Sequence, residues 1–79
     1  MARLPQVSGR QLARLLESLG YERVRQRGSH ARFELATEHG THGVTVPMHE
    51  AIAKGTLGDI LRQVANWTGV SRDELAARL

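Results

Sequence analysis

The spacing of apolar residues changes twice along this 79-residue chain, and that change constrains the fold more than any other feature. Four leucines recur at helical spacing over residues 12–19, residues 21–46 largely alternate with a period of two, and residues 57–64 return to helical spacing. Spacings of three and four indicate a helix with one buried face, and alternation indicates a strand with one buried face. The sequence therefore predicts a helix, then strands, then a helix.

The first predicted helix runs from Ser8 to Leu19. Ser8 and Gln11 form a capping-box pattern, in which each side chain accepts a hydrogen bond from the other residue's backbone N–H. Gly20 supplies the C-terminal stop.

Three strands with short connections are predicted next, in residues 21–27, 30–35 and 44–46. Gly28 breaks the first alternating run, and Pro47 ends the third. Short connections favour an antiparallel meander.

Thr56 with Asp59 three residues later predicts the cap of the second helix, which runs to Trp67 or Thr68 and stops at Gly69. Ser71 with Glu74 predicts a capping box for a short tail helix. Trp67 is expected to pack between the second helix and that tail, in preference to serving as a platform for a base.

These elements predict one α+β domain over residues 1–79, in the order α-β-β-β-α with a short C-terminal helix. Each helix has one apolar stripe, so both are expected on the one apolar face of a three-stranded antiparallel sheet. The residues expected to face the helices are Val24, Phe33, Leu35, Val44 and Val46. Those expected on the open face or its rim are Arg23, Arg25, Arg27, His30, Arg32 and Glu34.

Composition narrows the chemistry. The chain has no cysteine, which excludes disulfides, a thiolate nucleophile and a cysteine-ligated zinc. The opening residues 1–5 carry no export signal, and no stretch approaches the roughly 20 apolar residues that span a bilayer, so we expect a cytoplasmic protein with no membrane association. Eleven Lys and Arg against eight Asp and Glu, with arginine dominant, favour a polyanionic partner.

His30 is the candidate catalytic residue. An imidazole exchanges protons near neutral pH, and nearby arginines hold phosphate while favouring the neutral ring. RNA supplies its own nucleophile, the 2′-hydroxyl, so cleavage needs positioning, proton transfer and cationic stabilisation, with no metal or other cofactor. Gly28 permits close approach of the backbone to a ligand, and the Ser29 hydroxyl can contact phosphate.

Other candidates have two interpretations each. His49 can supply a second proton-transfer group or phosphate contact, or it can cap a loop. Lys54 precedes a helix N-terminus that can attract phosphate, or belongs to an ordinary cap. His39 and His42 have a spacing that could pair on a metal, although histidines at a turn are usually solvated.

Three motifs occur in order between Ser8 and Gln63, namely Gly28-Ser29-His30, Thr45-Val46-Pro47-Met48-His49, and Lys54-Gly55-Thr56-Leu57 with Ile60-Leu61-Arg62-Gln63. Together they resemble the HicA family of bacterial toxins, also called YcfA-like proteins. The resemblance implies a fold similar to the double-stranded RNA-binding domain, mRNA interferase activity that halts translation, and neutralisation by a HicB antitoxin. It also equates His30 with the essential histidine of the family.

The chain departs from the family pattern in two places. Residues 64–69 form a longer exit from the second helix than is common, which bears on how the tail packs. Arg27 stands where a lysine is frequent, which keeps the charge.

The sequence thus predicts a metal-independent endoribonuclease acting on mRNA, the toxin of a toxin–antitoxin pair, with His30 in proton transfer and a HicB-like antitoxin as partner. Its expected RNA contacts are Arg23, Arg25, Arg27, Gly28, Ser29, Arg32, His49 and Lys54. Two alternatives stay open, a non-catalytic RNA-binding module and a domain whose basic face docks an acidic protein.

Overall fold

The computed structural model of the chain describes residues 4–79. Residues 1–3 lie outside the described part, and they belong to the N-terminal segment in which no export signal is expected. The elements are α1 (Gly9–Ser18), β1 (Glu22–Arg27), β2 (His30–Thr37), β3 (Gly40–Pro47), α2 (Lys54–Thr68) and α3 (Arg72–Ala77). The predicted α+β order is confirmed.

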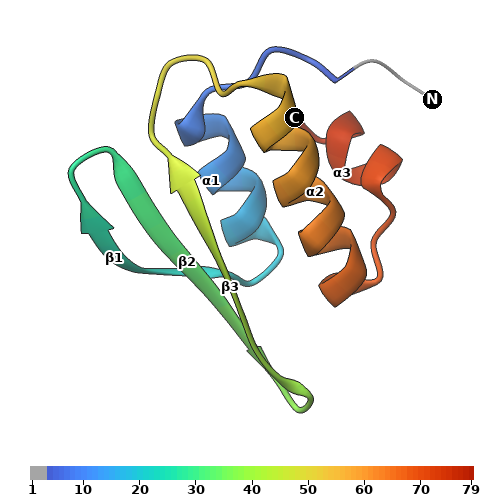
Figure 1. Cartoon of the computed structure of the whole chain (residues 1–79). Helices are drawn as coiled ribbons and strands as arrows, with labels where there is room; N and C mark the ends of the chain where they lie inside the picture. Colours follow the sequence, from blue (N-terminus) through green and yellow to red (C-terminus); the bar gives the residue numbers. More distant parts are fainter. Residues whose placement is uncertain (1–3) are drawn as a thin grey trace.

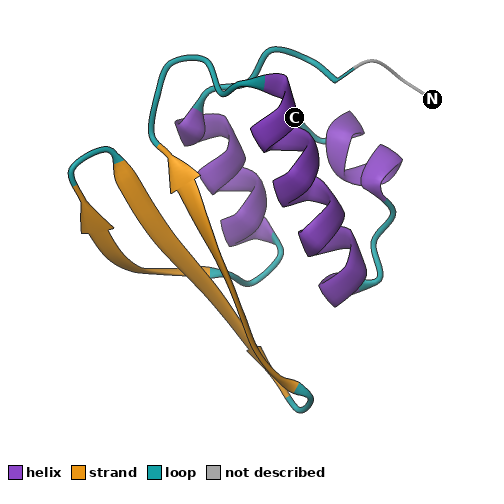
Figure 2. Ribbon diagram, in the orientation of Figure 1, coloured by secondary structure: helices purple, strands orange, loops and turns teal. Residues whose placement is uncertain are grey.

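The strands form one antiparallel sheet in the order β1-β2-β3. Both long helices cover the same face of that sheet, and α3 lies on the far side of α2 (Figures 1 and 2). The β1–β2 turn, the end of β3 and the N-terminal ends of α1 and α2 lie together at one end of the molecule, opposite the β2–β3 turn (Figure 1). This shared end is called the turn end below.

Local sequence accounts for α1. The Ser8 Oγ accepts from the Gln11 backbone N–H at 3.1 Å, and the Gln11 Oε1 accepts from the Ser8 backbone N–H at 2.9 Å. The predicted capping box is therefore confirmed.

The core lies between the helices and the sheet. Its largest fully buried side chains come from the sheet, from all three helices and from the segment before α1. They are Phe33, Leu12, Leu16, Leu57, Leu61, Leu75, Val7, Val46 and Val64. Burying an aliphatic or aromatic side chain of this kind contributes about 1.5–3 kcal/mol, so both helices are held firmly on the sheet.

The prediction for β1 was wrong at two residues, because a β-bulge shifts the register between Arg23 and Arg25. Val24, expected to face the helices, is 50% exposed. Arg23, expected on the open face, pairs opposite the buried Phe33 and holds its guanidinium 5.2 Å from the centre of that ring. A bulge places one extra residue against the partner strand, so the side-chain alternation is broken there.

Two other boundaries differ from the prediction. The β2–β3 hairpin is longer than expected, because its strands pair as far as Thr37 and Gly40. The second helix begins at Lys54, two residues before the predicted Thr56 cap, and its N-cap residue Ala53 makes no side-chain capping bond. Asp59 bonds Arg62 at 3.1 Å and takes no part in a cap.

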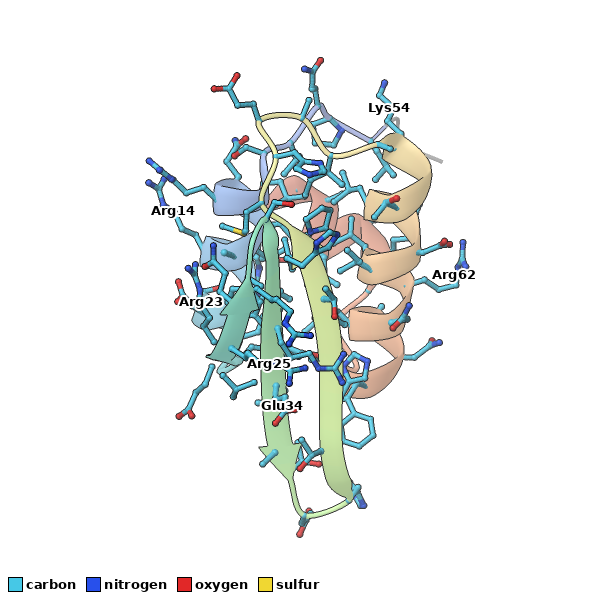
Figure 3. All side chains as sticks on the ribbon, turned by 60° about the vertical axis from the view of Figure 1, so that its left-hand side comes forward. Arg14, Arg23, Arg25, Glu34, Lys54 and Arg62 are labelled. Atoms are coloured by element: carbon cyan, nitrogen blue, oxygen red, sulfur yellow. The ribbon has the colours of Figure 1, made fainter. Side chains whose placement is uncertain are left out.

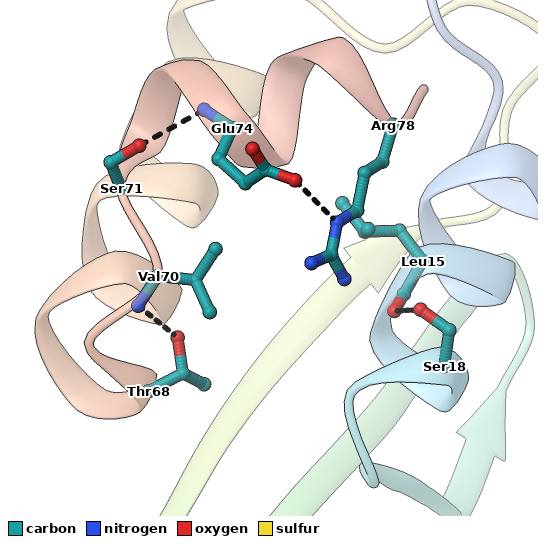
Figure 4. Close-up of polar contacts among 7 residues, drawn as sticks. All are labelled: Leu15, Ser18, Thr68, Val70, Ser71, Glu74 and Arg78. Carbon is teal, nitrogen blue, oxygen red and sulfur yellow. Dashed lines mark hydrogen bonds and ion pairs between the residues drawn. The ribbon is translucent and has the colours of Figure 1, made fainter.

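The tail packs against α2 through Leu75, which is fully buried. The Ser71 Oγ accepts from the Glu74 backbone N–H at 3.1 Å, which is one half of the predicted capping box. The Glu74 carboxylate accepts from Arg78 at 3.1 Å in place of the second half (Figure 4). Trp67, expected between α2 and the tail, instead stacks on the His42 ring of β3 with the ring centres 5.5 Å apart. The prediction for Trp67 was therefore wrong, and this side chain joins α2 to the hairpin.

Within residues 4–79, no helix is long and apolar enough to cross a membrane.

Candidate active site

The turn that carries His30 is built on Gly28, whose φ of 58° lies in the left-handed region that favours glycine. His30 is the first residue of β2, and its neighbours in the sheet are Arg27 on β1 and Pro47 on β3. The side chain is exposed. Alternation along β2 puts it on the side of Arg32, as predicted.

The segment after β3 passes directly over this turn. The Met48 backbone N–H donates to the Ser29 carbonyl at 2.6 Å, and the Gly9 N–H donates to the His49 carbonyl at 2.9 Å. A Cβ at Gly9 would lie 2.5 Å from the Pro47 oxygen, so only glycine allows α1 to approach the segment this closely. The backbone around His49 is thus tied both to the turn that carries His30 and to α1.

These ties bring His30 and His49 together. Their ring centres are 6.4 Å apart with an angle of 69° between the planes, and both side chains are exposed. Two imidazoles this close can both contact one bound group, and both rings are open to solvent. One ring can accept a proton while the other donates one, which is the division of labour in general acid–base catalysis.

A hollow of about 720 Å³ opens beside His49, between the start of α1 and the edge of β1. Arg10 of α1 and Arg23 and Gln26 of β1 line it, and Glu50 contributes a carboxylate. Pockets of a few hundred Å³ are large enough for a small organic ligand. The space next to the histidine pair is therefore lined by cationic and hydrogen-bonding groups.

The open face of the sheet is a separate surface. Arg25 and Arg32 pair across β1 and β2 there. The Arg32 guanidinium already donates to the Thr45 hydroxyl at 3.3 Å and lies 3.8 Å from the Glu34 carboxylate. Figure 3 shows Arg25 and Glu34 on this face. Its charge is mixed, because Glu34 lies there among the arginines, as alternation predicted.

The predicted RNA contacts therefore divide into groups. Arg27, Gly28 and Ser29 lie next to His30, and the fold brings His49 to them. Arg25 and Arg32 lie on the open face, whereas Arg23 points into the hollow on the helix side. Lys54 is exposed at the first residue of α2, at the top of the view in Figure 3 and apart from Arg25.

The other two histidines lie towards the opposite end. His39 is exposed in the β2–β3 turn. His42 is half-buried, and its Nδ1 lies 2.7 Å from the Tyr21 hydroxyl. Burial raises the pKa of Tyr21 to about 12. Burial and the nearby Arg32 charge lower the pKa of His42, against a hydrogen bond with Gln63 that raises it.

This environment explains His42 as a packing residue that links the hairpin to α2. Within the described residues, no group of three or more His, Cys, Asp or Glu side chains is arranged to hold a metal ion.

Sequence reasoning missed three residues of the hollow, namely Arg10, Gln26 and Glu50. Arg10 lies on the polar side of α1, where a solvated charge is the usual role. Its place two residues after the Ser8 cap was the available signal, because that position lies in the first turn of the helix, and the turn end gathers the N-terminal ends of both long helices. Nothing in the local pattern indicated that Gln26 or Glu50 would share a hollow with it.

Comparison with known proteins bears on this site. A family model described as the HicA toxin of bacterial toxin–antitoxin systems matches residues 9–65, which include the histidine pair and most of the hollow. No curated protein and no solved structure matches the chain. The family match covers well over half of the sequence and contains all three motifs that carried the resemblance. The chain therefore belongs to the HicA toxin family of bacterial toxin–antitoxin systems.

Proposed function

We propose that the chain is an endoribonuclease that cleaves mRNA without a metal ion, with His30 as general base and His49 as the second proton-transfer group. His30 removes the proton of a 2′-hydroxyl, and that oxygen attacks the adjacent phosphorus. The bond from phosphorus to the 5′-oxygen of the next nucleotide breaks, and His49 protonates the departing oxygen. The products are a 2′,3′-cyclic phosphate and a free 5′-hydroxyl.

The observation that carries this proposal is the distance of 6.4 Å between the two imidazole centres at the turn end. A single histidine can serve as base but leaves the leaving group without an acid. Two exposed imidazoles this close to each other can supply both groups, so the reaction needs no protein nucleophile and no Lewis acid.

Positive charge near the pair supports the same reaction. Arg27 lies next to His30 in the sheet. A guanidinium binds two phosphate oxygens at once, which stabilises the additional negative charge of the pentacoordinate phosphorane. The N-terminal ends of α1 and α2 add positive potential at the same end of the molecule.

The first test measures cleavage of a labelled single-stranded mRNA fragment by purified protein in excess EDTA. Replacing either His30 or His49 with alanine is expected to slow cleavage by roughly 10²–10⁴-fold, the usual contribution of a general acid or base. The double variant is expected to be little slower than the single ones, because groups that act in one step are not additive.

His39→Ala is the matched control, because it removes an exposed histidine from the opposite end of the molecule. Equal cleavage by wild type and His30→Ala would contradict the catalytic assignment. Binding of RNA without cleavage by any form would favour a non-catalytic RNA-binding module.

We further propose that the antitoxin partner implied by the family is a HicB-like protein, and that the cytoplasm, where mRNA is found, is the place of action. The simplest inhibition covers the turn end or occludes His30. Such a partner would lower cleavage in proportion to the fraction of toxin bound, and RNA and partner would compete for the same surface.

A further inference from the structure

His49 lines one side of the hollow, and the other residues that line it have no part in the proton transfers of the proposed reaction. Two of these other residues are arginines. We propose that the hollow binds the phosphate and ribose of a nucleotide adjacent to the cleaved bond, with Arg10 and Arg23 on the phosphate. This inference rests on the proposed function, because it assigns the path of the RNA through the same site.

The arginines are placed for this task. Arg10 is exposed in the first turn of α1, and its side chain makes no hydrogen bond or ion pair within residues 4–79. Arg23 faces it from the edge strand β1, with its guanidinium braced over the Phe33 ring at 5.2 Å. A guanidinium that is already oriented loses less conformational entropy when it binds phosphate.

Gln26 connects the hollow to the β1–β2 turn that carries His30. Its Oε1 accepts from Arg23 at 3.1 Å, and its Nε2 donates to the Gly28 carbonyl at 3.2 Å. A nucleotide held by Arg23 is therefore coupled through one side chain to the backbone two residues before His30. The bulge in β1 makes this possible, because regular alternation would point Arg23 to the other face of the sheet.

The open face of the sheet is the competing path for RNA. Arg32 is occupied there by Thr45 and Glu34, and Glu22 pairs directly opposite Glu34. Two carboxylates on that surface repel phosphate. The hollow has one carboxylate, Glu50, against two guanidinium groups. Of these, the Arg10 side chain makes no hydrogen bond or ion pair within residues 4–79, whereas Arg32 on the open face makes both.

The test measures the affinity of wild type and variants for a short single-stranded RNA in which every ribose is 2′-O-methylated, so that no 2′-hydroxyl can attack. Arg10→Ala and Arg23→Ala are each expected to weaken binding about tenfold, the loss of one charge-assisted contact to phosphate. Each is also expected to reduce the slope of log affinity against log salt by about one.

Arg78→Ala is the control, because it removes the same charge from α3, on the far side of α2 and outside the family match. Its exposed pair with Glu74 is worth little. Arg23→Ala also removes the contact with Phe33, so its thermal unfolding is compared with wild type. Arg10 has no such contact, and its variant decides the outcome if Arg23→Ala unfolds.

Affinities of Arg10→Ala and Arg78→Ala that both equal wild type would overturn the nucleotide site, as would equal weakening by both. The proposed function is judged separately. If wild type cuts RNA in EDTA while Arg10→Ala binds and cuts normally, only the site in the hollow fails. If wild type does not cut but Arg10→Ala selectively weakens binding, the site stands and the nuclease assignment fails.

Discussion

Gly9 is the residue on which the position of His49 depends most directly. Its N–H donates to the His49 carbonyl at 2.9 Å, and its missing side chain leaves room for the backbone of Pro47 and Met48. The geometry of the histidine pair thus depends on a residue that has no functional group of its own.

Gly9→Ala is therefore expected to lower the free energy of unfolding by about 1–3 kcal/mol, the usual cost of forcing extra atoms into a packed region. The added Cβ would lie 2.5 Å from the Pro47 oxygen and 2.6 Å from the Met48 Cα, and backbone atoms cannot move aside cheaply. Denaturation by urea measures the change.

The matched control is Gly55→Ala in the first turn of α2, where an added Cβ meets no other atom within 4 Å. There alanine is expected to stabilise the helix by up to about 1 kcal/mol. Equal effects of the two substitutions would show that the close approach at Gly9 has no energetic weight.

At the scale of elements, α1 was predictable because its determinants are local. The Ser8 and Gln11 pair and the leucine spacing lie within one segment of sequence. The bulge in β1 was not predictable, because Val24 and Arg23 alternate regularly in the sequence and only pairing with β2 shows the extra residue. Strand alternation therefore gave the correct face for His30 and Arg32 and the wrong face for Arg23.

The link between the hairpin and α2 was also hidden from the sequence. Tyr21, His42 and Trp67 lie on three different elements or connections, and no short motif joins them. The prediction that Thr56 caps α2 failed although the local pattern for a cap was present. The helix begins two residues earlier, at Lys54, so Thr56 lies inside it.

His42 makes this link sensitive to pH. Its pKa in the folded protein is below the usual 6.5, so the unfolded chain binds more protons as the solution becomes acidic. Its contribution to stability is complete above about pH 6.5 and is lost as the pH falls through the lowered pKa.

Urea denaturation between about pH 8 and pH 5 is expected to show this loss in wild type and a smaller loss in His42→Gln. His39→Gln, which changes an exposed histidine in the adjacent turn, is the control and is expected to follow wild type. Parallel curves for wild type and His42→Gln would contradict the role given to His42.

At the scale of the whole molecule, the fold gathers most of the candidate site residues at one end. A net charge of only +3 gives little attraction for RNA by itself. The turn end gathers both helix N-terminal ends and the β1–β2 turn (Figure 1). His30 and Arg27 flank that turn, His49 lies beside His30, and the hollow with Arg10 and Arg23 opens next to His49. The sequence identified His30 as a candidate and suggested His49 as a second one. The distance between their rings could not be predicted, because it depends on three segments that meet only in the folded chain.

The central claim is that the two histidines transfer protons while the 2′-hydroxyl of the RNA attacks the adjacent phosphorus. The chemical groups at the ends of the cut RNA test this claim most directly. After digestion in excess EDTA, mass spectrometry of the fragments is expected to find a 2′,3′-cyclic phosphate on one side of the cut and a 5′-hydroxyl on the other. A substrate with deoxyribose at the cut position is expected to remain intact. Fragments with a 5′-phosphate and a 3′-hydroxyl, or cutting of the deoxyribose substrate, would contradict the account.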